Sequence, residues 1–202
     1  YLHVRHNKKL KFSSPNAFFA EKKEIVEESF PGDIVGLHDT GNFKIGDTLT
    51  EGEVLNFKGI PSFSPEHFRY VNNADPMKAK QLFKGLDQLM DEGVAQLFTL
   101  DMNGRKVIGT VGALQYEVIQ YRLEHEYGAK CSYENLQVHK ACWVEPEDHK
   151  NEEFKEFKRV KQRYLAKDKQ GQLVFLADSA FTIQMTQSKY PTVKLHFVSE
   201  FK

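Results

Sequence analysis

The chain has 202 residues, of which 40% are hydrophobic and 28% charged, a globular composition that suits one large domain or two small ones. Lys and Arg together number 28, as do Asp and Glu, so nucleic-acid binding would depend on local basic patches. The apolar runs are far shorter than the roughly 20 residues that span a bilayer, and two cysteines are too few for a disulfide framework. We therefore expect a cytoplasmic monomer without membrane contact. Because the sequence begins at Tyr1 without an initiator methionine, we expect a fragment of a longer protein.

The first sixty residues predict a small β-rich domain. Short stretches of strand-forming residues alternate with turn signals such as Asn7 and Pro31-Gly32. Their close spacing, with no helical period, favours a β-barrel over residues 1–60 that is incomplete in this chain. The expected strands are 2–5, 9–12, 25–30, 33–38, 47–50 and 54–57.

A short linker follows at residues 59–65. Its two prolines, Pro61 and Pro65, remove backbone donors and stiffen the path of the chain. We expect this linker to hold two domains in one relation, with Phe63 and Phe68 packed at their junction.

Residues 66–202 predict a second, α+β domain. An N-cap with proline at the first helical position, Asp75-Pro76, follows a strand and opens a helix with a 3.6-residue apolar period. The order β-α-β-β-α-β over 66–135 is the ferredoxin-like pattern, an α/β sandwich of two helices on an antiparallel sheet. The expected elements are strands 67–71, 95–100, 106–111 and 130–134, with the second helix at 113–127. The inward apolar residues are expected to be Leu82, Phe83, Leu86, Leu89 and Met90 on the first helix and Leu114, Val118, Ile119, Tyr121 and Leu123 on the second.

The tail, residues 136–202, predicts a C-terminal β-α-β extension of the sheet. Its expected elements are a strand at 137–144, a helix at 146–166, a strand at 173–177, a short helix at 180–190 and a strand at 193–198. We detect no long internal repeat in the sequence.

Catalytic and cofactor motifs are missing from the sequence. A phosphate-binding loop of the form G-x-x-x-x-G-K-[ST] does not occur, and neither do the usual zinc-ligand spacings. His3 and His6 should lie on opposite faces of a strand, and Gly104, Gly109 and Gly112 fit a hairpin turn and close packing. We therefore expect no catalytic residue, cofactor site or metal site in this chain.

A small cytosolic cysteine hydrolase is a remote alternative. It would use Cys131 or Cys142 with His139, because a thiolate needs a nearby imidazole. Both cysteines lie in strand-like segments, where cysteine commonly serves as a small core residue.

Basic side chains line two of the expected helices. They contact RNA phosphates or form an ordinary solvated face, and the sequence leaves both interpretations open. The candidate contacts are Lys78, Lys80 and Lys84 on the first helix and Lys155, Lys158, Arg159, Lys161 and Arg163 on the third.

Two glycine-aspartate turns carry the first family resemblance. The segments 31–37 and 45–49 contain Gly32-Asp33 and Gly46-Asp47, and together they resemble the second domain of translational GTPases. The turns make physical sense, since glycine tolerates a positive φ and aspartate caps nearby backbone donors.

The rest of the chain extends this resemblance. Segments 85–89 and 109–118 are similar to domain III of elongation-factor-like GTPases. Segments 57–66, 81–89, 143–145 and 189–191 resemble most closely the peptide-chain release factor 3 family.

That resemblance implies a non-catalytic, ribosome-binding and signal-relay region of a translational GTPase that promotes dissociation of class I release factors in termination. It implies GTP or GDP and Mg²⁺ only in a separate N-terminal GTPase domain. The implied partners are ribosomal RNA, small-subunit proteins, class I release factors and that domain. A self-contained RNA- or ribosome-binding protein of translation-factor ancestry is the alternative.

Overall fold

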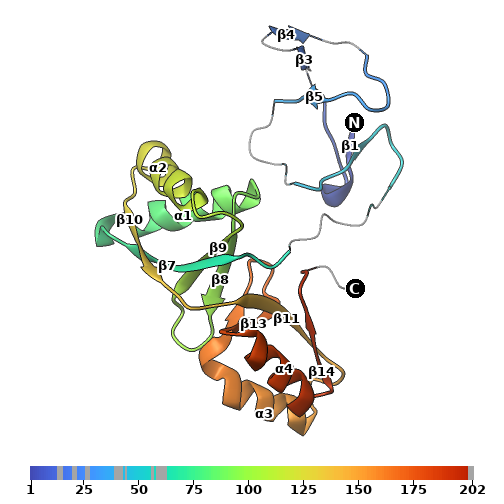
Figure 1. Cartoon of the computed structure of the whole chain (residues 1–202). Coiled ribbons are helices and arrows are strands. Elements are labelled where there is room, and N and C mark those ends of the chain that lie inside the picture. The colour runs from blue at the N-terminus through green and yellow to red at the C-terminus, as the bar shows by residue number, and fades with distance from the viewer. Residues whose placement is uncertain are drawn as a thin grey trace. The chain divides into compact units, whose positions relative to one another are not determined.

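The structure is a computed structural model whose contacts divide the chain into two compact units, Tyr1–Ile60 and Pro61–Lys202 (Figure 1). The residues that it describes are 1–12, 16–19, 22–25, 28–38, 43, 45–55, 57 and 63–199.

The described part of the first unit contains two small antiparallel sheets. One has the strand order β2-β1-β6 and the other β4-β3-β5. A single 3-10 turn, η1 (Val4–His6), connects β1 to β2 and ends at Asn7, whose φ is 49°. The strands are β1 Leu2–His3, β2 Lys8–Lys9, β3 Asn16–Phe19, β4 Lys22–Ile25, β5 Val35–Gly36 and β6 Leu49–Thr50.

The strands of the first unit are shorter than expected, and one hairpin is new. The strand expected at 25–30 was wrong, because β4 ends at Ile25 and residues 28–30 lead into a turn. In that turn the Asp33 carboxylate accepts from the Phe30 amide at 2.7 Å. Val54, Leu55 and Phe57 are also outside any strand, while position 56 is outside the described residues. The β3–β4 hairpin carries no strong turn signal in the sequence.

Over the described residues 63–199, the second unit contains one eight-stranded antiparallel sheet and four α-helices. The strands are β7 His67–Asn73, β8 Gln96–Leu100, β9 Lys106–Thr110, β10 Cys131–Asn135, β11 Lys140–Pro146, β12 Leu165–Lys167, β13 Leu173–Ala177 and β14 Val193–His196. The helices are α1 Ala79–Asp91, α2 Gln115–Tyr127, α3 Glu152–Lys161 and α4 Ala180–Lys189, with 3-10 turns η2 Pro76–Lys78 before α1 and η3 Gln162–Tyr164 after α3.

The order of strands shows that this unit is a tandem of two similar halves. The sheet runs β10-β7-β9-β8-β12-β13-β11-β14, so each half places its four strands in the order 4-1-3-2 and the two halves meet at their second strands. The first half confirms the ferredoxin-like expectation. The tail is more than a β-α-β extension, since it forms a complete second β-α-β-β-α-β half. The sequence showed no repeat because the halves share a fold and not an obvious residue pattern.

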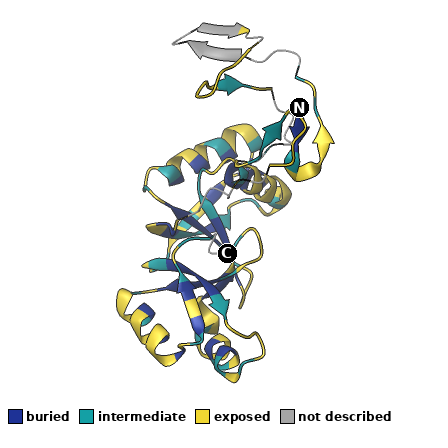
Figure 2. Cartoon of the chain, turned by 90° about the vertical axis from the view of Figure 1, so that its right-hand side faces the viewer, coloured by how far each residue is buried: buried dark blue, intermediate teal, exposed yellow. Residues whose placement is uncertain are grey.

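Apolar packing fills both faces of this sheet. On the outer faces, α1 and α2 cover the first half and α3 and α4 cover the second, and each pair has its own core. A third core joins the remaining faces of the two halves and contains Phe98, Val107, Trp143, Val174 and Leu176. The strands are accordingly buried while the helices expose their outer sides (Figure 2). The halves therefore pack as helix, sheet, sheet and helix.

The linker residues that the structure describes belong to the second unit. The buried Ser64 hydroxyl accepts from the Ala141 amide at 2.8 Å, and its own amide donates to Phe197 O at 3.0 Å. Phe68 lies in the shared core of the two halves, and Phe63 is 66% exposed. Phe68 therefore packs inside the second unit and does not take the junction role expected of it, while the junction role of Phe63 stays a prediction. Residues 58–62, including Pro61, lie outside the described residues.

Helix boundaries follow local capping. Asp75 accepts from the Met77 amide, Asn151 from the Glu153 amide, and Gly128 ends α2 with φ of 62°. The helix expected at 146–166 was too long at both ends. β11 continues to Pro146, which pairs with Val193, and β12 begins immediately after η3.

The inward face of α2 differs from the expected one. Tyr116, Ile119 and Leu123 face the core, whereas Leu114, Val118 and Tyr121 are exposed. Both sets follow a helical period, so periodicity could not choose between them. Phe83 on α1 is also exposed, because the core of α1 is filled by its neighbours Leu82, Leu86, Leu89 and Met90.

Gly85 marks the closest approach between α1 and α2. A Cβ added there would lie 2.7 Å from Leu123 Cδ2 and 2.8 Å from Tyr127 Cγ. We predict that Gly85→Ala lowers the free energy of unfolding by about 1–3 kcal/mol, because overpacking forces the helices apart. Denaturant titration followed by the fluorescence of Trp143, the chain's single tryptophan, measures this change.

The matched control is Gly112→Ala. No atom lies within 4 Å of the added Cβ, and the backbone is not in the left-handed region. It should shift the free energy of unfolding by no more than about 0.5 kcal/mol. Equal effects of the two substitutions would show that helix contact at Gly85 is not the cause.

Candidate functional site

The cysteines occupy apolar cores. Cys131 packs under α1 and α2, and Cys142 packs under α3 and α4. Burial raises the pKa of the Cys142 thiol to about 12, and burial also raises the pKa of Cys131 against the opposing effect of a hydrogen bond with Tyr133. His139 is exposed and immediately precedes β11. A reactive thiolate requires a lowered pKa, so this environment disfavours the cysteine-hydrolase alternative.

The histidines near the N-terminus do not lie on opposite strand faces. Because Val4–His6 forms a 3-10 turn, the rings of His3 and His6 make a T-shaped contact with centroids 4.8 Å apart. His3 Nε2 lies 2.9 Å from Asp47 Oδ2. Within the described part of the chain, no group of three or more His, Cys, Asp or Glu side chains could hold a metal ion.

The two glycine-aspartate turns have different local roles. Gly32 and Gly46 both have positive φ, at 101° and 89°. Asp33 caps an exposed turn through the Phe30 amide. Asp47 is 8% exposed, accepts from Arg5 Nε at 2.5 Å and Arg5 Nη2 at 2.6 Å, and also contacts His3. The second turn thus fixes the segment before β6 to the β1–β2 connection.

The basic candidates of the first helix lie on its solvent side, with Lys78 at the end of η2 and the other two on α1. Lys78, Lys80 and Lys84 are all exposed. Lys78 Nζ donates to Gly128 O at 2.7 Å, which joins the start of α1 to the end of α2. Lys78 therefore has a structural contact, and Lys80 and Lys84 present their charge to solvent.

The candidates on α3 form a second exposed group. Lys155 pairs with Glu152 at 2.5 Å, and Lys158 Nζ lies 4.7 Å from the centroid of the Phe154 ring. Arg159 and Arg163 are exposed, and Lys161 is half-buried with its ammonium 5.5 Å from the Phe175 ring centroid. The helices α1 and α3 cover different halves of the second unit (Figure 1). The basic candidates consequently form two separate surfaces.

A further basic surface was missed in the sequence. The β1–β2 connection carries exposed Arg5, His6, Lys8, Lys9 and Lys11. Arg5 is engaged by Asp47, whereas the three lysines extend along β2 and beyond it. The sequence signal for this surface was the run R-H-N-K-K-L-K at positions 5–11. It was missed because the segment was interpreted only as strands and not as a cluster of charge. We call Lys8, Lys9 and Lys11 the basic hairpin.

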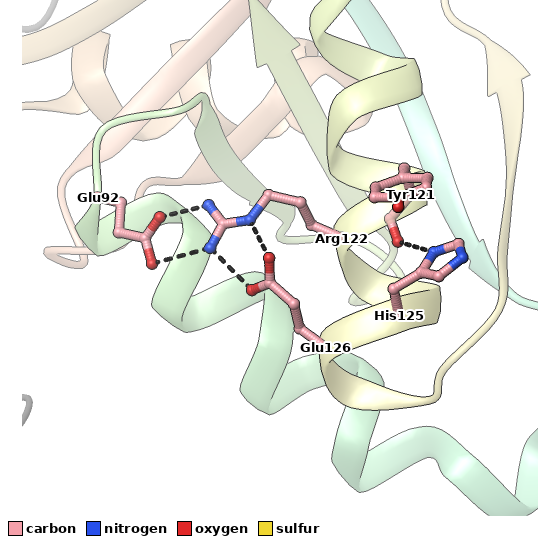
Figure 3. Close-up of polar contacts among 5 residues, drawn as sticks. All are labelled: Glu92, Tyr121, Arg122, His125 and Glu126. Atoms are coloured by element: carbon pink, nitrogen blue, oxygen red, sulfur yellow. Dashed lines mark hydrogen bonds and ion pairs between the residues drawn. The ribbon is translucent and has the colours of Figure 1, made fainter. Parts of the chain in front are cut away.

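An arginine connects the outer helices of the first half. Arg122 on α2 donates to Glu126 at 2.6 and 2.8 Å and to Glu92, the C-cap residue of α1 (Figure 3). Hydrogen bonds to Glu126 and Glu92 raise the pKa of Arg122, and the bond from Arg122 lowers the pKa of Glu126. The Arg122 guanidinium therefore links α2 to the end of α1.

Helices of the described residues are all too short or too polar to cross a membrane.

The buried thiol of Cys142 gives a test of its environment. In a Cys131→Ala background, we predict that iodoacetamide at pH 8 alkylates the folded chain roughly 100-fold or more slowly than the unfolded chain, because only the thiolate reacts. Mass spectrometry of timed samples measures both rates. Equal rates in the two states would contradict burial of this thiol and reopen the nucleophile interpretation.

Comparison with protein families accounts for both units. The sequence model of the family described as Class II release factor RF3, C-terminal domain, matches residues 57–187, more than half of the chain. The model described as Elongation factor G domain 2 matches residues 1–52. Both matched regions are non-catalytic parts of a translational GTPase. The chain therefore belongs to the class II release factor RF3 family, and its two units are translation-factor domains.

Proposed function

We propose that this chain is the ribosome-binding and signal-relay region of a class II release factor acting in translation termination in the cytoplasm. It positions the factor on the small ribosomal subunit while a separate GTPase domain, with GTP or GDP and Mg²⁺, controls departure of the class I release factor. The chain's own residues bind and position, and no bond is formed or broken on them.

The match of residues 57–187 to the release-factor family carries this proposal. It extends through the linker and nearly the whole tandem unit, and the preceding 52 residues match a domain of another translation factor. Two translation-factor domains in succession support a role on the ribosome.

Charge on the first unit supports contact with ribosomal RNA. The basic hairpin places three exposed lysines on one short segment, and none of them lies in a core. Lysine contacts with phosphates release counterions, so a small cluster contributes to affinity in a protein of zero net charge. The exposed charges of α3 offer a second surface of the same chemistry.

The packing of the second unit supports the relay. A module transmits the movement of one partner to another only if it is rigid or has discrete arrangements. The two halves share a core through Phe98 and Trp143, whose ring centroids lie 6.4 Å apart. Lys169 in the β12–β13 turn also reaches α1, donating to Asp87 O at 2.6 Å and pairing with Asp91 at 2.8 Å. These contacts make a rigid relay physically reasonable.

A competition experiment tests the proposal. Ribosomes halted at a stop codon after peptide release carry a fluorescent class I release factor, and full-length class II factor with GTP is added. We predict that an excess of the 202-residue chain slows the loss of fluorescence, because it occupies the binding site of the full-length factor. Replacing the basic hairpin by Lys8→Glu, Lys9→Glu and Lys11→Glu should weaken this inhibition.

The salt dependence of ribosome binding provides the control. Each lost phosphate contact should reduce the slope of log affinity against log salt by roughly 0.7–0.9. The variant Lys80→Glu, Lys84→Glu makes the same kind of charge reversal on α1, and its salt dependence is compared with that of the basic-hairpin variant. If the chain sediments with ribosomes yet leaves the dissociation rate unchanged at saturation, it is a ribosome-binding protein without this role in termination.

A further inference from the structure

Helix α2 has apolar side chains on two opposite faces. Tyr116, Ile119 and Leu123 fill the core, and the side turned away from it exposes Leu114 by 73% and Val118 by 50%. Single exposed apolar residues are common, but a helical stripe that repeats the spacing of a core face is a mark of a binding surface.

Tyr121 extends this stripe by one further turn. It is 62% exposed, so Leu114, Val118 and Tyr121 follow the i, i+4, i+7 spacing by which one helix packs on another. Its ring stacks on that of His125, with centroids 3.9 Å apart and an angle of 23° between the planes (Figure 3). His125 Nδ1 donates to Tyr121 O at 2.8 Å, so Nε2 is the ring nitrogen that lies outside this bond. We call these four residues the outer stripe.

Acidic side chains border the outer stripe. Glu117 and Glu124 are exposed on the same helix, and Glu124 forms an ion pair with the exposed Lys130 at 3.0 Å. On the other border Arg122 is held between Glu92 and Glu126. The chemistry complementary to this surface is an apolar ridge flanked by cations.

We propose that the outer stripe of α2 is a docking site for a basic amphipathic helix of a protein partner. Aliphatic side chains of the partner pack on Leu114, Val118 and Tyr121. Lysine or arginine side chains beside them approach Glu117 and Glu124, and a donor can reach His125 Nε2. The proposal goes beyond the role in termination and does not depend on it.

The sign of the charge favours protein over RNA as the occupant. An exposed tyrosine and histidine could stack on a base, yet phosphates would meet Glu117 and Glu124 on one border, and on the other border Arg122 is already paired with Glu92 and Glu126. The lysines suited to phosphate lie elsewhere, on the basic hairpin and on α3. Acidic borders instead favour a cationic partner and speed its encounter.

The second half of the tandem contains a natural comparison. In α4, Ile183 and Thr186 face the core, and Tyr190 follows the helix with the same spacing of three and four residues as the core face of α2. The equivalents of Leu114 and Val118 are Phe181 and Met185, which are 69% and 51% exposed. Glutamines at 184 and 187 and no glutamate occur along α4 itself, and the neighbouring Glu156 is paired with Lys189, so this surface has the apolar residues without glutamates on its own helix.

A peptide titration tests the proposal on the full chain. The probe is a labelled peptide of about 18 residues, built from leucine and lysine in amphipathic order, whose binding is followed by fluorescence anisotropy. We predict saturable binding that weakens tenfold or more in the Leu114→Asp, Val118→Asp variant. The matched Phe181→Asp, Met185→Asp variant should remain within twofold of the parent chain. Trp143 fluorescence confirms that both variants are folded.

Charge reversal separates specific docking from general stickiness. The double substitution Glu117→Lys and Glu124→Lys should lower the affinity for the leucine-lysine peptide about tenfold. It should raise the affinity for a leucine-glutamate peptide of the same pattern. The proposal is overturned if binding is not saturable, or if α2 and α4 substitutions have equal effects. It is also overturned if a single-stranded RNA binds the outer stripe more tightly than the basic peptide, with loss of that binding in the α2 variant.

Discussion

The apolar layer between the two half-sheets is the constraint on which the second unit depends. Direct strand pairing between the halves is short, since β8 and β12 pair only at Leu100–Ala166 and Thr99–Lys167. Burial of Phe98, Trp143 and their neighbours supplies the larger apolar contact across this joint. Because both faces of the sheet are packed, the outer sides of the helices supply much of the surface that this unit presents to partners.

That arrangement assigns different chemistry to different surfaces. The basic hairpin and α3 offer lysine and arginine side chains to an anionic partner, and α2 offers an acid-bordered apolar stripe. The tandem fold makes the contrast informative, because α2 and α4 hold equivalent positions in halves of equal topology. Both expose apolar residues at matching positions, and of the two helices only α2 carries glutamates in its own sequence. Specificity in such a pair comes from the surrounding charge more than from the shared apolar residues.

Local signals were sufficient for much of the fold. The cap at Asp75, the turn at Gly104 and the αL residue Gly128 identify the elements of the first half, because each acts within a few residues. Non-local features were not accessible in this way. The three-residue strand β12 directly follows a helix and is defined by its partners β8 and β13. The duplicated topology likewise becomes visible only when pairing is known.

For the candidate surfaces too, local features could be predicted from the sequence and non-local ones could not. The lysines of α1 and α3 could be predicted as exposed from helical patterning, but their separation onto two halves depended on the tandem fold. The two apolar faces of α2 were indistinguishable until the core was known. Asp47 meets His3 and Arg5 across more than forty residues of sequence, a contact that no local pattern predicts.

The most direct test of this account is whether the second unit opens as one cooperative body. Native-state hydrogen exchange at increasing denaturant compares the slowest amides of β9, in the first half, with those of β13, in the second. A shared core predicts that both sets converge on the same free energy of opening with the same denaturant dependence. If β9 or β13 exchanges through a lower-energy opening with a smaller denaturant dependence, the halves unfold separately and the rigid relay is contradicted.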